Sequence, residues 1–126
     1  MNQHLDRLDY CHARLKPAIL KVLAAMDALG YPMIVTDGIR SAEQQATLYA
    51  KGRSAPGPIV THCDGVVKKS NHQGGKACDC CFVIDGEPSW DHRLPWACYG
   101  ACLEAVGLRW GGNFSTIVDW PHAELP

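Results

Sequence analysis

The sequence has no excess of charge of one sign. Its 126 residues include 12 lysines and arginines against 13 aspartates and glutamates, so the formal net charge is −1. No basic stripe or run of like charges appears anywhere in the chain. Proteins that bind nucleic acid or anionic membranes carry such clusters of lysine and arginine. Both classes of partner are therefore poor candidates.

Long apolar runs are also missing. The longest fall far short of the roughly 20 residues that cross a bilayer, and the N-terminal residues 1–6 do not resemble a signal peptide. Internal repeats, low-complexity segments and linkers are missing too. The sequence therefore predicts a single domain, residues 1–126, that is made in the cytoplasm and is large enough to form a hydrophobic core.

Cysteine, in contrast, is abundant. An odd number cannot be fully paired within one chain, and a cytoplasmic protein stays in a reducing compartment. No second Cys-x-x-Cys pair completes a tetrahedral thiolate site, so we expect most of these residues to be reduced, small and buried. A disulfide-rich secreted domain is the alternative, and it predicts few free thiols. The seven cysteines are at positions 11, 63, 78, 80, 81, 98 and 102.

The first third of the chain is predicted to be mostly helical. In residues 3–29, Pro17 fits the first turn of the main helix and Gly30 fits its end. The apolar run 33–36 then predicts a buried strand. The inner face of the helix follows from three- and four-residue steps between apolar residues, namely Leu15, Ile19, Val22, Leu23, Met26 and Leu29.

A second helix is predicted to begin after Ser41. Gln44 stands three residues later, as in a capping box, and the helix reaches about Gly52. Arg40 therefore lies at a strand-to-helix junction, from which a side chain can reach over a cleft. An exposed arginine is more often only solvated, so both interpretations remain open at this point. The predicted inner face comprises Ala42, Gln45, Ala46, Leu48 and Tyr49.

The middle of the chain predicts a long loop followed by a central strand. Residues 53–76 show little periodicity, and loops of this length are uncommon in compact domains unless they carry function. Residues 76–84 follow as the strand. Alternation places Asp79 and Cys81 on one face, with Cys78, Cys80 and Phe82 on the other.

The C-terminal third predicts one helix and two short strands. The helix spans residues 95–106 and is rich in small residues for close packing, and the strands cover 108–110 and 117–119 around a Gly-Gly-Asn turn. Few helices and several short strands in this order predict an α+β domain, with helices packed on a small antiparallel sheet.

Two stretches, residues 70–79 and 119–122, contain side chains suited to a metal site. His72, Asp79 and His122 are of the types that bind a divalent cation through nitrogen and oxygen. Zinc held by two imidazoles and one carboxylate keeps a fourth position open for water, which is the arrangement of a hydrolytic site. Manganese or cobalt would also accept these ligands. Only the fold can bring such distant residues together.

Proton transfer and substrate contacts need further groups. Asp119 lies three residues before His122 and can take a proton from the water and pass it to the departing amine. Arg40 would stabilise the tetrahedral oxyanion or hold a substrate carboxylate. Ser70 would position the substrate backbone, or would only shape the turn that presents His72.

Taken together, Ser70-x-His-x-x-Gly-x-Ala-x-Asp79, Trp110-Gly-Gly and Asp119-x-Pro-His122 resemble the zinc peptidases of family M15, the D-alanyl-D-alanine carboxypeptidase and VanY type. The stretches 36–53 and 107–112 resemble the L-alanyl-D-glutamate endopeptidase branch that is found among bacteriophage endolysins. The similarity as a whole covers nearly all of the chain from about residue 17. Ile39, Ala123 and the cysteines of the 76–84 strand depart from that pattern.

The resemblance implies the fold of hedgehog and D-Ala-D-Ala peptidases. It implies one catalytic zinc ion held by His72, Asp79 and His122, with Asp119 as the base. Arg40 becomes a substrate or transition-state contact.

It further implies an enzyme that cleaves the L-Ala–D-Glu bond of the peptidoglycan stem peptide. We expect a monomer without a separate cell-wall-binding module, because the catalytic domain uses every residue. Such an endolysin would lack a signal peptide and reach the wall through a holin-type pore. A D,D-carboxypeptidase or dipeptidase of the same fold is the second hypothesis, and it predicts release of terminal D-Ala. A non-catalytic zinc-binding recognition module is the third. Asp119 beside a full set of ligands argues against that third hypothesis.

Overall fold

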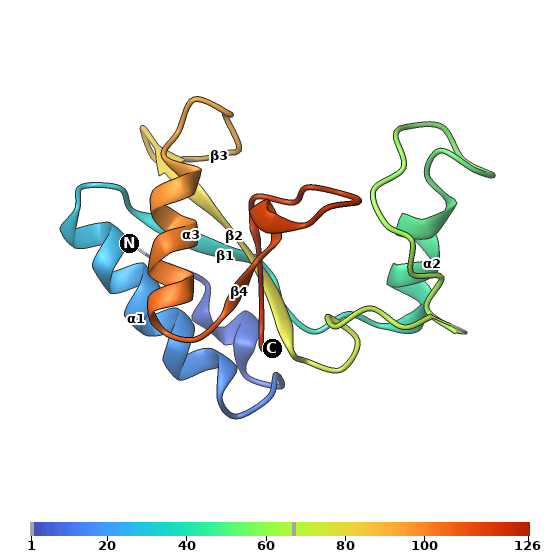
Figure 1. Ribbon diagram of the computed structural model, residues 1–126, viewed down its shortest axis with the longest axis horizontal. Coiled ribbons are helices and arrows are strands. Elements are labelled where there is room, and N and C mark those ends of the chain that lie inside the picture. The colour runs from blue at the N-terminus through green and yellow to red at the C-terminus, as the bar shows by residue number, and fades with distance from the viewer. Residues whose placement is uncertain (1, 67) are drawn as a thin grey trace.

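Residues 2–66 and 68–126 are described by the structure, a computed structural model (Figure 1). The strand order of its sheet is β1-β2-β5-β4, with β3 pairing to the C-terminal end of β2, and every pairing is antiparallel. The α+β fold with a small antiparallel sheet is thus confirmed. The strands are β1 (Met33–Asp37), β2 (Ala77–Ile84), β3 (Glu87–Ser89), β4 (Arg109–Trp110) and β5 (His122–Glu124).

The helices fall into two groups. The first, α1 and α3, pack against each other and against the sheet, whereas α2 lies at the opposite end of the molecule (Figure 1). Among the described residues, no helix is both long and apolar enough to cross a membrane. The helices are η1 (Leu5–Leu8), α1 (Leu15–Ala28), α2 (Ala42–Ala50), α3 (Trp96–Ala105) and η2 (Gly111–Asn113), of which η1 and η2 are 3-10 helices.

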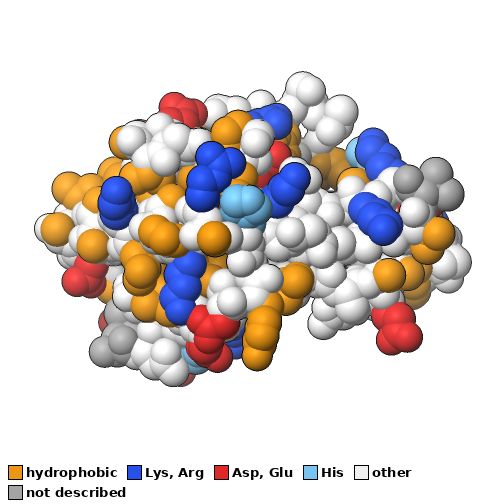
Figure 2. Space-filling view, turned by 90° about the horizontal axis from the view of Figure 1, so that it is seen from below, with side chains coloured by type: hydrophobic (Ala, Val, Ile, Leu, Met, Phe, Trp, Pro, Cys, Tyr) orange, Lys and Arg blue, Asp and Glu red, His pale blue; other side chains and the backbone are white. Residues whose placement is uncertain are grey.

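We divide the molecule into a body and a lobe. The body consists of residues 2–37 and 77–126, which form the sheet with α1 and α3. The lobe consists of residues 38–66 and 68–76, with α2 and the long loop that follows it. In the view of Figure 2, lysine and arginine side chains are scattered over both parts rather than merged into one patch.

Hydrophobic burial holds the body together. Pro17 lies in the first turn of α1, and Gly30, with φ of 88°, follows the end of the helix, as predicted. Leu29, the residue after the end of α1, is 56% exposed, so its predicted place in the core was wrong. The predicted core residues of α1 that are buried are Leu15, Ile19, Val22, Leu23 and Met26.

Cysteines serve as small core residues. Cys78, Cys80 and Cys81 are fully buried in β2, the other four are partly buried, and none of the seven forms a disulfide. The free thiols agree with the prediction of reduced cysteines rather than a disulfide framework, whereas the prediction that most of them are buried holds for only three of the seven. Burial raises the pKa of the Cys81 thiol to about 11.

The hairpin of β2 and β3 was not predicted. The sequence analysis placed no strand between residues 84 and 95, but Asp85 and Gly86 both have positive φ (52° and 79°) and form a two-residue turn from which β3 returns to pair with β2. Asp-Gly at such a turn is a strong hairpin signal, because only a few residue types tolerate these backbone angles.

The last strand was predicted in the wrong place. β5 covers residues 122–124 instead of 117–119, and residues 114–121 form an irregular loop. The hydrogen bonds that hold that loop include those from Asp119 N to Gly111 O (2.9 Å) and from the Trp110 indole N–H to Trp120 O (2.8 Å). The strand forms where the chain can pair with both β2 and β4, and local β-propensity did not reveal those partners.

The helices α2 and α3 bury different residues from those expected. The capping box of Ser41 and Gln44 is present. However, α2 ends at Ala50, and Gln45 is its only buried residue, because α2 does not pack on the sheet. In α3 the large residues Trp96, Tyr99 and Leu103 are buried, while the alanines face outward. The segments 51–66 and 68–76 form turns and irregular backbone, as predicted.

Candidate metal centre and active site

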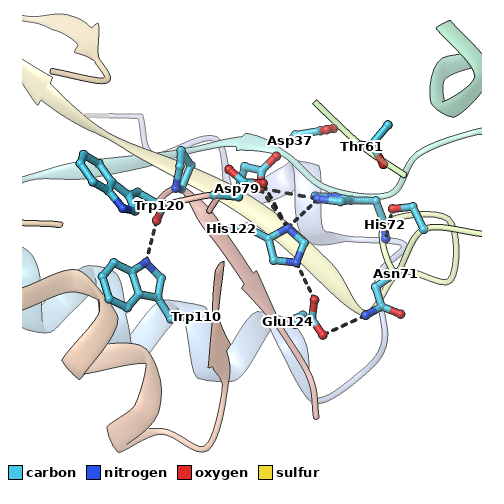
Figure 3. A network of polar contacts seen from close by, with 12 residues as sticks. Asp37, Thr61, Asn71, His72, Asp79, Trp110, Trp120, His122 and Glu124 are labelled. Carbon is cyan, nitrogen blue, oxygen red and sulfur yellow. Dashed lines mark hydrogen bonds and ion pairs between the residues drawn. The ribbon is translucent and has the colours of Figure 1, made fainter. Parts of the chain in front are cut away.

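Three side chains from distant parts of the chain meet at one point (Figure 3). His72 Nε2 and His122 Nδ1 are 3.3 Å apart, although 50 residues separate them in the sequence. Each of these nitrogens lies 3.5 Å from Asp79 Oδ1. Asp79 and His122 are direct partners across β2 and β5, so the register of the sheet places them side by side. His72 approaches from the lobe.

A tight turn presents His72. The Ser70 hydroxyl accepts a hydrogen bond from His72 N (3.1 Å), and His72 O accepts from the backbone N–H groups of Arg40 (2.9 Å) and Gly75 (3.2 Å). Gly75 has φ of 69°, and a Cβ there would lie 3.0 Å from Cys11 Cα. Only glycine suits such a position, because it lacks a Cβ and tolerates positive φ. Ser70 thus shapes the turn, and its predicted contact with substrate stays a prediction.

The outer nitrogen of each imidazole has an acceptor as partner. His72 Nδ1 lies 2.9 Å from Gly38 O, and His122 Nε2 lies 2.7 Å from Glu124 Oε1. Both partners are oxygens without a proton, so these ring nitrogens must be the donors. In the neutral rings the lone pairs of His72 Nε2 and His122 Nδ1 then face Asp79. Metal-binding histidines are usually oriented in this way.

The donor set fits a divalent cation. Asp79 Oδ1 is buried without a hydrogen-bond partner in the described structure, which is costly for a carboxylate oxygen. A cation among Asp79 Oδ1 and the two ring nitrogens would satisfy this oxygen and both lone pairs. Two imidazoles and one carboxylate are ligands that zinc accepts.

Attraction between Asp79 and the two histidines shifts the pKa values of the cluster. Burial alone would raise the pKa of Asp79, but His122 and His72 outweigh it and hold this pKa far below its usual range. Burial alone would lower the pKa of His122, but the nearby carboxylates of Asp79 and Glu124 raise it to about 9. In the metal-free protein a proton on His122 therefore supplies the positive charge that a cation would bring.

Asp119 stands at the edge of this cluster. Its Oδ2 lies 3.8 Å from His122 Nδ1, and its side chain is 43% exposed. The backbone bond to Gly111 fixes its position, and a Cβ on Gly111 would collide with Asp119 O. Burial, followed by the negative charge of Asp79, raises the pKa of Asp119. A carboxylate with a raised pKa accepts a proton more readily.

Arg40 is anchored rather than solvated. It donates to Asp37 Oδ2 (2.6 Å) and Gln45 Oε1 (2.7 Å), and its Nη2 lies 3.9 Å from Asp79 Oδ2. Arg40 and Ser70 line a cavity of about 410 Å³ that also contains the three clustered side chains and Asp119. The guanidinium thus faces the space where a substrate would lie.

Glu124 is a site residue that the sequence analysis missed. Its second oxygen accepts from Asn71 Nδ2 (2.9 Å) and lies 3.5 Å from Arg109 Nη1. Figure 3 shows His122 between Asp79 and Glu124. The spacing His122-x-Glu124 would reveal this pair on one face of a strand, but the strand had been placed at 117–119. Cys81, which was predicted to share a face of the strand with Asp79, is not part of the cluster of possible ligands.

Comparison with known proteins gives consistent results. Residues 64–125 match the family model described as D-alanyl-D-alanine carboxypeptidase. The chain is 32% identical over 113 residues to the peptidoglycan L-alanyl-D-glutamate endopeptidase CwlK of Bacillus subtilis (strain 168). That alignment covers 81% of this chain and 65% of CwlK, so the chain spans just under two thirds of the length of that relative.

Two solved structures show the same fold. The L-Ala D-Glu endopeptidase ChiX of Serratia marcescens superposes with a TM-score of 0.68 at 23% identity, covering 98% of this chain and 86% of ChiX. The D,D-pentapeptidase VanY of a VanB-type vancomycin resistance cassette, solved as a mutant with Zn(II), superposes with a TM-score of 0.65 at 18% identity. Here the coverage is 91% of this chain and 72% of VanY.

Proposed function

Because the chain belongs to the M15 family of D-alanyl-D-alanine carboxypeptidase-type peptidases, we propose that it is a zinc-dependent peptidase that hydrolyses the L-Ala–D-Glu bond of the peptidoglycan stem peptide. The observation that carries the proposal is the cluster of His72, Asp79 and His122, with an unpartnered carboxylate oxygen at its centre. The likeness to CwlK favours the L-Ala–D-Glu bond over a terminal D-Ala bond.

The proposed ligand atoms are His72 Nε2, Asp79 Oδ1 and His122 Nδ1. Zinc bound there would lower the pKa of a water molecule and polarise the carbonyl of the scissile amide. Asp119 accepts the proton of the attacking water and delivers it to the departing nitrogen. Arg40 donates hydrogen bonds to the oxyanion as it develops, and its bonds to Asp37 and Gln45 hold it in place for this.

Cleavage of purified peptidoglycan with and without a chelator tests the proposal. We expect soluble muropeptides with a new L-Ala carboxyl terminus and a new D-Glu amino terminus, and no release when the metal is removed. Mass spectrometry of the products identifies the bond. Release of terminal D-Ala instead would support the D,D-carboxypeptidase alternative, and a metal-bound protein that cleaves nothing would support a recognition module.

Asp119→Ala isolates the proposed base. We expect a drop in kcat of about 10²–10⁴-fold, because general acid–base catalysis is lost, while bound zinc, measured by atomic absorption, stays at one ion per chain. Asp27→Ala, on the exposed surface of α1, is the matched control. Unchanged activity of Asp119→Ala would rule out its role as the base.

The biological setting that we propose is phage endolysin-type lysis by a monomer. The resemblance of residues 36–53 and 107–112 to the endolysin branch supports it. Expression in a bacterial host should then cause lysis only when a holin-type pore is expressed with it, and lysis without a pore would contradict this route. Light scattering of the purified protein measures its molar mass and so tests whether it is a monomer.

A further inference from the structure

We propose that an aromatic pocket beside the active site binds the N-acetylmuramyl sugar to which the stem peptide is attached. This inference rests on the proposed function. The pocket has a volume of about 390 Å³. Asp119 lines both this pocket and the metal cavity, so the two spaces adjoin at the proposed base. The other lining residues that we use here are Trp90, His92, Trp96, Val118 and Trp120.

The walls of the pocket are held in place. The Trp96 indole N–H donates to Asp91 O (2.9 Å), and Trp120 O accepts from the Trp110 indole (2.8 Å). The ring centroids of His92 and Trp120 are 4.6 Å apart, and those of Trp96 and Trp120 are 6.4 Å apart. Aromatic rings that already contact one another lose little conformational freedom when a ligand arrives. The pocket is therefore preformed.

The rim of the pocket exposes large apolar side chains. Trp90 is 50% exposed and Val118 is 55% exposed, although neither position is needed to complete the hydrophobic core. Exposed tryptophan beside a concave site is typical of ligand binding. A pyranose ring suits such a rim, because its C–H face stacks on an indole while its hydroxyl groups stay in water. An indole offers this apolar face together with a polar edge.

The distribution of charge places the sugar on this side of the metal. The metal cavity is lined by the cations Arg40, Lys68 and Lys69 and by the carboxylates of Asp79, Asp119 and Glu124, whereas the described lining of the aromatic pocket includes Asp119 but no lysine or arginine. On one side of the scissile bond the stem peptide continues with D-Glu, whose free carboxylate can pair with one of the cations of the metal cavity. On the other side of the bond stands L-Ala, whose nitrogen is joined to the lactyl group of muramic acid. The aromatic pocket, which has no lysine or arginine in its described lining, therefore suits the uncharged sugar.

The test compares two soluble substrates that differ only in the sugar, N-acetylmuramyl-L-Ala-D-Glu-L-Lys and N-acetyl-L-Ala-D-Glu-L-Lys. For the zinc-loaded protein we expect kcat/KM to be on the order of tenfold higher with the sugar. Trp90→Ala should bring that ratio close to one. Tyr10→Ala, which removes an exposed aromatic ring outside the pocket, should keep it. A ratio near one in the unmodified protein would overturn the inference while leaving the peptidase function intact.

A binding measurement separates this inference from the proposed function. NMR spectra of Asp119→Ala record the indole N–H signals during titration with N-acetylmuramyl-L-alanine or with N-acetyl-L-alanine. We expect the signals of Trp90 and Trp120 to shift only with the sugar-bearing ligand, even if no cleavage activity is ever found. Equal shifts with both ligands would assign the pocket to a peptide group instead, and no shift with either would also overturn the inference.

Discussion

Asp79 and His122 stand on paired strands within the hydrophobic body, whereas His72, Arg40 and Ser70 belong to the lobe. The core of the body contains fully buried side chains such as Phe82 and Tyr99. The only buried residue of α2 is a polar one, Gln45, whose amide donates to Thr61 Oγ1 (3.1 Å) and Cys63 O (2.8 Å). Apolar packing thus holds one wall of the site, and hydrogen bonds hold the other.

This difference has a consequence for how the site works. Regions with few buried apolar contacts open locally at a smaller free energy than the core. The lobe carries Arg40 and Ser70 over the cavity, and we expect it to move when substrate enters. Asp79 and His122 should stay in place, because sheet pairing and core packing fix them.

The largest expected effect is on the free energy of unfolding, when one side chain is truncated in the body and one in the lobe. Phe82 lies against Tyr31 and Trp96, with ring centroids 6.3 and 4.8 Å away. Phe82→Ala should lower the free energy of unfolding by about 3–5 kcal/mol, because it leaves a cavity in the core. Leu48→Ala, in α2, should lower it by less than about 1 kcal/mol. Urea denaturation measures both, and equal losses would show that body and lobe are one packed unit.

The stability of the metal-free protein should depend on pH through His122, a residue of the body. The pKa of His122 is raised from 6.5 to about 9 in the folded state, so its stabilising effect is complete below pH 6.5 and is lost as the pH rises through about 9. The full effect is on the order of 3 kcal/mol. We expect the melting temperature in chelator to fall between pH 6.5 and 8.5.

Two comparisons identify the source of that fall. His122→Asn should show a flatter profile over the same pH range, because the titrating imidazole is gone. Saturating zinc should also remove the fall, since a metal ligand must be the neutral imidazole. If His122→Asn lost stability as steeply as the unmodified protein, another group would be responsible.

The smallest expected effect concerns the orientation of His122. Glu124→Gln keeps the size of the side chain but removes the negative charge of the carboxylate. One oxygen of that carboxylate accepts from His122 Nε2, and the other accepts from Asn71 Nδ2. Loss of such a partner typically weakens metal binding by about 10–100-fold. Competition with a chelating dye measures zinc affinity, with Glu87→Gln, on the exposed β3, as the control. Unchanged affinity would show that sheet packing alone orients the ring.

Much of the fold was predictable where local signals decide the structure. The apolar steps from Leu15 to Met26, the capping box at Ser41 and the apolar strand 33–36 each depend on neighbours within a few residues, and each was found as predicted. Predictions failed where distant partners decide. α2 looked amphipathic but does not pack on the sheet, and the last strand forms at 122–124 because β2 and β4 are there to pair with it.

The sequence by itself determined which side chains the site would contain: two imidazoles and one carboxylate as metal donors and a second carboxylate as the base, in a motif that resembles that of family M15. Side-chain type and short spacing are properties of the chain itself and do not depend on how it packs. Only the tertiary structure decided that His72 and His122 face the same oxygen of Asp79, and that Gly38 O and Glu124 set which nitrogen of each ring faces inward. Sheet register and the turn at Gly75 determine these contacts, because they join residues up to 50 positions apart.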